Sequence, residues 1–220
     1  MSGPVARVRA AAPLCAAAIL GLVASGCASF STLDRARTLD RGRVRITPAV
    51  GTIGSVAEGG AAFHPRFELA AGYGAEEGVE VFGKAWYAGI TGGTKLQVLR
   101  SRSESSGVDV AFAPAVGWQW SDKLSFELPL LVGINFGERS QVVLAARPSY
   151  LGWFGAGGLA RPVSFVLVGG SIGVWWRIAD ALALLPEVAW TGAAFAEEGM
   201  GTLTGGGLGL QLSLGAAILP

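Results

Sequence analysis

Cys27 is the residue whose surroundings point most directly to a chemical modification. It follows the small residues 24–26, which close an apolar stretch over 10–23, and the only charges before it are two arginines. A basic start and a short apolar run are typical of a secretory signal peptide, and this run is too short to span a bilayer. A cysteine thiolate is the nucleophile that a diacylglyceryl donor needs. We therefore predict a lipoprotein signal peptide over 1–26 and a lipid on Cys27; the alternative is an ordinary signal peptide with an incidental cysteine.

His64 is the only histidine of the chain, and histidine is the commonest general base in enzymes. Glu68 lies four residues further on, which is two steps along the same face of a strand, so the pair could serve a serine-histidine-carboxylate or an aspartate-histidine site. No partner serine stands out. We therefore predict no catalytic residue and place His64 in a polar network with Glu68 and Arg66.

Two other kinds of chemistry find little support. The single histidine excludes a metal site built from several histidines, and the carboxylates show no recognisable ligand spacing. The glycine-rich run 205–209 has the composition of a phosphate-binding loop, but it lacks the Lys-Ser or Lys-Thr ending and lies in a strand pattern. We expect no metal and no cofactor.

Composition narrows the class of protein. With 17 Lys and Arg against 16 Asp and Glu, the charge gives no reason to expect nucleic acid. The chain is too apolar for disorder, yet no apolar run after the signal reaches the length of a membrane helix. Cys15 lies in the predicted signal and Cys27 would be acylated, so we expect no disulfide and no thiolate zinc site.

What the rest of the chain shows is alternation with a period of two, the pattern of strands with two different faces. Over 207–218, leucines alternate with small or polar residues, and residues 108–120 and 123–136 divide in the same way. These runs exceed the common strand length and suit the ~9 to 11 residues that a tilted strand needs to cross a membrane. They predict an all-β fold, an antiparallel up-and-down transmembrane β-barrel.

The alternation predicts about ten strands, which cover residues 43–55, 61–73, 77–89, 93–101, 107–121, 123–136, 139–151, 163–177, 180–192 and 203–219. The polar segment between the signal and the first strand is interpreted as a tether between lipid and barrel. The predicted domains are therefore the signal peptide 1–26, a lipidated tether 27–42 and the barrel 43–220.

The charged residues of these strands fall on the face opposite the apolar one. They are Arg45, His64, Arg66, Glu68, Glu80, Lys84, Lys95, Asp109, Glu127, Arg147 and Glu187. A barrel spanning a membrane must close so that no backbone edge remains, which turns this face toward the lumen. Because acids and bases nearly balance, we predict a filled, charge-paired lumen; Arg100, near a strand end, is the exception to the division of faces.

Aromatic residues support the same division of faces. Bulky side chains predicted to narrow the lumen are those of Phe82, Trp86, Phe165, Leu167 and Trp175. Outward aromatics near strand ends are Phe63, Tyr73, Tyr87, Trp118, Trp120, Phe136, Tyr150, Trp176 and Trp190. Such positions are typical of the aromatic girdles of outer-membrane barrels.

A resemblance supports this interpretation. The segments Ala36-Arg37-Thr38-Leu39, Phe67-Glu68-Leu69-Ala70-Ala71-Gly72-Tyr73-Gly74 and Gly78-Val79-Glu80-Val81 resemble the opening hairpins of bacterial outer-membrane β-barrel proteins. In those proteins a strand ends in Tyr-Gly, a short turn follows, and the next strand begins with a glutamate on its buried face. The resemblance implies a bacterial outer-membrane location.

These observations favour a small outer-membrane β-barrel lipoprotein, not an enzyme, with a structural role or a narrow solute path. Its partners would be outer-membrane lipid and the covalent lipid on Cys27, and we expect a monomer whose lipid-anchored N-terminus faces the periplasm. The long connections 152–162 and 193–202 would then be external. Two alternatives remain: a barrel enzyme acting on lipid or peptide, and a lipid-tethered soluble barrel that carries an apolar ligand.

Overall fold

The computed structural model describes residue 29 and residues 31–57, 60–103, 105–120, 122–154, 163–196 and 208–219. Cys27, the predicted signal peptide and the glycines 205–207 lie outside the described residues. The strands are β1 (Val44–Ala57), β2 (Gly60–Glu76), β3 (Val79–Trp86), β4 (Gly89–Leu99), β5 (Ser106–Phe112), β6 (Ala115–Gln119), β7 (Lys123–Glu127), β8 (Leu130–Phe136), β9 (Ser140–Trp153), β10 (Val163–Ala179), β11 (Leu182–Ala196) and β12 (Leu208–Ile218).

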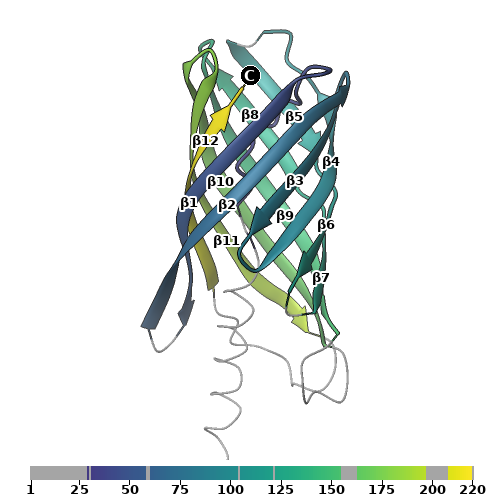
Figure 1. Cartoon of the computed structure of the whole chain (residues 1–220), viewed down its shortest axis with the longest axis vertical. Helices are drawn as coiled ribbons and strands as arrows, with labels where there is room; N and C mark the ends of the chain where they lie inside the picture. Colours follow the sequence, from purple (N-terminus) through teal and green to yellow (C-terminus); the bar gives the residue numbers. More distant parts are fainter. Residues whose placement is uncertain are drawn as a thin grey trace, which may run out of the picture.

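The strands form one closed antiparallel barrel (Figure 1). The ring closes where β12 pairs with β1, with Ile46 opposite Ile218. Both β5 and β6 pair with β4, so these two short strands together occupy one strand position in the ring. Both β7 and β8 pair with β9 and occupy one position in the same way. The ring therefore has ten positions, and the predicted fold class is confirmed.

Two prolines divide the wall strands that the sequence predicts as continuous. Pro114 follows β5 and Pro129 precedes β8, and proline has no N–H to give to a ladder. Hydrogen bonds continue across both interruptions, since Ala113 N donates to Pro129 O at 2.9 Å and Thr94 N donates to Pro114 O at 3.1 Å. The barrel thus stays closed at these points.

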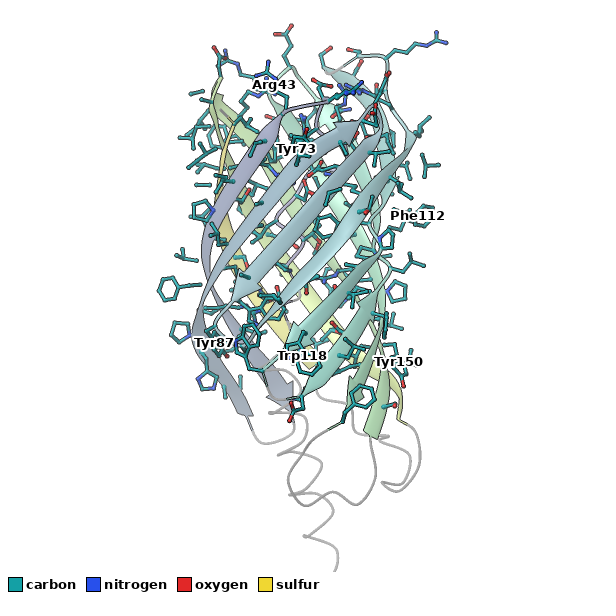
Figure 2. The ribbon with its side chains drawn as sticks, turned by 45° about the vertical axis from the view of Figure 1, so that its right-hand side comes forward. Arg43, Tyr73, Tyr87, Phe112, Trp118 and Tyr150 are labelled. Atoms are coloured by element: carbon teal, nitrogen blue, oxygen red, sulfur yellow. The ribbon has the colours of Figure 1, made fainter. Side chains whose placement is uncertain are left out.

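The outer face of the barrel is apolar over its whole height (Figure 2). Exposed side chains include Leu69, Leu144, Val188 and Leu212, which lie within strands far from one another in the sequence. All nine aromatics predicted to face outward are exposed. In Figure 2, Tyr87, Trp118 and Tyr150 lie at a similar level near one end, and Tyr73 lies toward the other.

The two ends of the barrel differ in their connections. At the end where β1 begins and β12 finishes, the connections are 77–78, 100–105, 137–139 and 180–181, and we call it the short-turn end. At the opposite end the connections are 58–59, 87–88, 120–122, 154–162 and 197–207, and we call it the long-loop end. The expected long connections after β9 and β11 thus share one end.

Candidate functional site

The described N-terminal residues run through the lumen, visible as the purple trace between the strands in Figure 1. We call Ser29 and residues 31–40 the plug segment. Seven of its residues are buried, namely Ser29, Ser31, Leu33, Ala36, Arg37, Thr38 and Leu39. The sequence predicts 27–42 as a lipidated tether between lipid and barrel; the structure places most of its described residues inside the lumen, and the lipidated tether itself stays a prediction. Hydroxyl and amide groups of the plug segment form hydrogen bonds with polar side chains of the wall. In a filled lumen these wall side chains have no surrounding water, so they need such partners.

Asp34 joins the plug segment to a cluster of charges on the wall. Its carboxylate lies 2.5 Å from Arg45 of β1 and 2.8 Å from Lys95 of β4. The same two cations hold Glu80 of β3, at 2.6 Å and 2.8 Å. Leu39 N also donates to Glu80 at 3.0 Å. Two cations and two carboxylates thus balance, and one of the carboxylates comes from the plug segment.

Glu68 of β2 is the centre of a second cluster, nearer the other end of the plug segment. It pairs with Arg66, accepts a hydrogen bond from Ser29 Oγ at 2.7 Å and accepts another from Ser31 Oγ. Lys84 Nζ donates to Ser31 O at 2.7 Å. The guanidinium of Arg66 also lies 5.2 Å from the Trp86 ring centroid, within the range of a cation–π contact.

Glu187 of β11 binds the plug backbone directly. Its two oxygens accept hydrogen bonds from Thr32 N at 2.7 Å and Leu33 N at 2.6 Å. Among the described residues, no Lys or Arg forms an ion pair with it. Consecutive backbone N–H groups therefore satisfy a carboxylate that would otherwise be buried alone, which is costly.

Asp109 of β5 receives the plug arginine. Arg37 Nε lies 3.2 Å from its carboxylate, and Ser101 N and Asn135 Nδ2 donate to it at 2.8 Å and 2.9 Å. Gln141 Nε2 adds a further donor at 2.9 Å, while its Oε1 accepts from Ala36 N at 3.0 Å. Arg37 thus supplies the cation that this buried acid lacks on the wall.

The plug segment has a defined direction in the barrel. Its C-terminal part lies at the short-turn end, where Asp40 pairs with Arg100 at 2.9 Å; this hydrogen bond holds the pKa of Asp40 below its ordinary value. At the other extreme, Ser29 lines a cavity together with Trp86 and Gln119, the last residues of β3 and β6. The chain therefore runs from the long-loop end toward the short-turn end before β1 begins.

Little space remains beside the plug segment. Four cavities lined by plug residues have volumes of about 30, 50, 30 and 10 Å³. A water molecule needs ~10 to 15 Å³ by the same measure, so each cavity holds a few waters at most. The described residues place no group of three or more metal-ligating side chains together, and no helix among them is long and apolar enough to cross a membrane.

No protein-family model matches this sequence, and no curated protein sequence matches it. Solved structures show similar folds at low identity. Neisserial surface protein A (NspA) is 12% identical with a TM-score of 0.43, covering 80% of this chain and 96% of that one. The outer membrane protease OmpT from Escherichia coli is 8% identical with a TM-score of 0.49, covering 84% and 100%. The translocator domain of the autotransporter NalP from Neisseria meningitidis is 9% identical with a TM-score of 0.45, covering 96% and 97%.

The structure brings together all but one of the charged residues that the sequence places in the lumen. Glu127 and Arg147, for example, pair at 2.5 Å, and Arg147 Nη2 also donates to Ser29 O at 3.2 Å. His64 is the exception, and its placement in this network is corrected. It lies in the part of β2 that extends toward the long-loop end, where its side chain is exposed. Cys27 lies outside the described residues.

The sequence reasoning missed the plug residues Asp34 and Arg37 and the wall amides of Gln97 and Gln141. Gln97 Oε1 accepts a hydrogen bond from Thr38 N at 2.7 Å, in the way that Gln141 accepts from Ala36 N. One signal was available: the inward-facing glutamines and Glu187 had no obvious inward partner. Such groups require a donor from another segment, because buried polar atoms are almost always paired.

Proposed function

We propose that this chain is a small bacterial outer-membrane β-barrel lipoprotein whose own N-terminal segment closes its lumen. The observation that carries this proposal is the reciprocal charge pairing between plug and wall. Asp34 supplies a carboxylate to Arg45 and Lys95, and Arg37 supplies a cation to Asp109. The wall charges nearly balance in sum, but Arg45 and Lys95 share one wall acid, Glu80, and Asp109 has its ion pair with the plug. This local pairing supports a lumen filled by the plug segment over a water-filled path.

The outer surface supports a membrane location. A closed barrel with apolar side chains outside and charges inside satisfies its backbone without an exposed edge, as a bilayer requires. The exposed aromatics near the strand ends fit the interfacial girdles of such barrels. A soluble carrier of an apolar ligand needs the opposite arrangement, with its apolar side chains inside.

The proposal includes a covalent lipid on Cys27, which rests on the signal-peptide pattern that ends there. Two acyl chains, each contributing ~0.8 kcal/mol per buried CH₂, anchor a chain durably. Replacing Cys27 with Ser should abolish labelling by radioactive palmitate. Equal labelling of the variant would rule out this modification.

The proposal also includes a structural role without catalysis. The enzyme alternative centres on His64 and Glu68, but the carboxylate of Glu68 is occupied by Arg66, Ser29 and Ser31. None of the contacts of the described residues joins the exposed His64 to it. An exposed histidine whose ring no acid orients supports the role without catalysis over the enzyme alternative.

Conductance in planar bilayers tests the closed lumen. The purified full chain should show little or no steady conductance, since the plug segment leaves only small cavities. The double variant Asp34→Ala, Arg37→Ala should conduct more often, because it removes the two plug charges that pair with buried wall residues. The matched control, Arg41→Ala with Glu76→Ala, removes an exposed pair 3.6 Å apart and should behave as the wild type. Large, stable, ion-selective channels in the wild type would contradict the proposal.

A further inference from the structure

The position of Ser29 limits the end of the barrel that the residues before it can reach. Ser29 is held from two sides, because its hydroxyl donates to Glu68 at 2.7 Å and its carbonyl accepts from Arg147 at 3.2 Å. It also lines a cavity whose other lining residues include Trp86 and Gln119, the last residues of β3 and β6 at the long-loop end. The preceding chain therefore starts from a fixed point near the turns that follow β3 and β6.

The length of chain between Ser29 and Cys27 decides which end Cys27 can reach. Two residues span at most ~7 Å when fully extended. The short-turn end lies the whole length of β3 away, from Trp86 back to Val79, which is roughly 17 Å along the barrel axis for a strand tilted by about 40°. With the plug segment seated, two residues are therefore too few to carry the chain back to the short-turn end.

The nearby rim is suited to receive a lipid. The turns 87–88 and 120–122 form it, and Tyr87 and Trp120 both expose their rings there. Trp120 Nε1 donates to Tyr87 O at 3.0 Å, which ties the two turns together. Outward Tyr and Trp residues mark the headgroup level of a bilayer. An acyl group that leaves the lumen at this point would therefore enter the membrane at the level of the headgroups and glycerol backbones of the lipids.

We propose that the acylated N-terminus leaves the barrel over the rim at 87–88 and 120–122, so that its lipid lies in the leaflet at the long-loop end. This inference rests on the lipid anchor included in the proposed function. Because external loops are the longer ones in outer-membrane barrels, this leaflet is the outer one. The sequence alone led to the opposite expectation, an anchor that faces the periplasm.

Epitope tags in the full-length chain test the course of the N-terminus. One tag is inserted between Ala28 and Ser29, and two reference tags are inserted at 58–59 and at 77–78, which belong to opposite ends of the barrel. Antibody binding is compared on intact and permeabilised cells. The tag ahead of Ser29 should behave like the tag at 58–59. If it behaves like the tag at 77–78, the inference is overturned, whichever end of the barrel faces outward.

A disulfide tests whether the seated plug and the lipid occur in one molecule. The hydroxyl oxygens of Thr32 and Ser171 lie 3.1 Å apart, so the variant Thr32→Cys, Ser171→Cys should lock the plug segment to β10. The locked form, separated from the open form on a non-reducing gel, should carry the palmitate label. A label confined to the unlocked form would show that lipidation requires an unseated plug and would overturn the inference.

The two proposals fail in different ways. If palmitate labelling is absent, the lipid anchor fails, but the tags still report the end at which the chain leaves the lumen. Suppose instead that labelling is present and depends on Cys27. If the tag ahead of Ser29 then has the same accessibility as the tag at 77–78, the exit over the long-loop rim is contradicted, while the lipid anchor stands.

Discussion

Asp34 of the plug segment lies 2.5 Å from Arg45 at the start of the barrel wall, and both side chains are largely buried. The same carboxylate holds Lys95, so removing it leaves two buried cations with Glu80 as their shared acid. A buried pair of this kind is worth little when intact compared with hydrophobic packing, but breaking it is costly. The pair thus ties the seating of the plug to the folding of the barrel.

Asp34→Ala should therefore destabilise the folded barrel by ~3 to 5 kcal/mol, because it strands a buried cation. Glu76→Ala, which breaks the exposed pair with Arg41, should cost only about 0 to 1 kcal/mol. Urea unfolding in lipid vesicles measures both. Similar costs for the two variants would show that Asp34 is not buried among these charges.

The outer face provides a second test, based on the depth of a residue in the bilayer. Leu144 is exposed within β9 and faces outward between Val132 and Ile172 of the neighbouring strands. Leu144→Arg should cost ~2 to 4 kcal/mol, whereas Phe136→Arg, at the end of β8, should cost ~0 to 1 kcal/mol. The same vesicle unfolding assay compares them. If the two substitutions cost the same, the apolar face does not contact lipid.

Much of the barrel could be predicted because alternation of side chains is a local signal. The run from Leu208 to Ile218 carries its own division of faces, and the strand lies where that division places it. One turn is misplaced, since the predicted strands 77–89 and 93–101 leave the connection at 90–92, whereas it lies at 87–88. In the barrel Gly93 lies within β4, where a Cβ would come within 2.3 Å of Pro114 O. Gly93 permits a close approach of β4 to the segment around Pro114 and does not make a turn.

The plug segment could not be predicted in the same way, because it has no periodicity of its own. Each of its contacts joins residues far apart in the sequence, as when Thr32 N reaches Glu187 or Thr38 N reaches Gln97. Polar residues with no repeat favour either a solvated linker or a buried segment that satisfies a polar lumen. Only the wall that surrounds the segment distinguishes the two.

The exposure of His64 leads to a prediction of no effect. His64→Gln should change stability by no more than ~0.5 kcal/mol, as for most surface substitutions. Wild type and variant are compared for cleavage of outer-membrane lipids and of dibasic peptides, and faster migration of the unheated protein on a detergent gel verifies folding. We expect no turnover in either. Turnover in the wild type that is lost in a folded variant would establish an enzyme and refute the structural role.

Gly74 of β2 offers the sharpest test of the point where the plug segment turns into β1. A Cβ built at Gly74 would lie 2.1 Å from the backbone oxygen of Asp40, and a backbone atom cannot move aside as a flexible side chain can. Gly74→Ala should therefore push the end of the plug segment away from the wall and cost ~1 to 3 kcal/mol, the usual range for overpacking. Gly83→Ala is the matched control, because its Cβ would meet no atom closer than Thr91 O at 3.7 Å.

The seating of the plug segment at Gly74 can be measured directly. In the Thr32→Cys, Ser171→Cys background, Gly74→Ala should lower the yield of the disulfide and raise the frequency of openings in planar bilayers. Gly83→Ala should leave both unchanged, since it adds a methyl group in ordinary contact. An unchanged disulfide yield in Gly74→Ala, with folding intact, would mean that Asp40 does not pass over β2 and that the plug segment enters the lumen by another route.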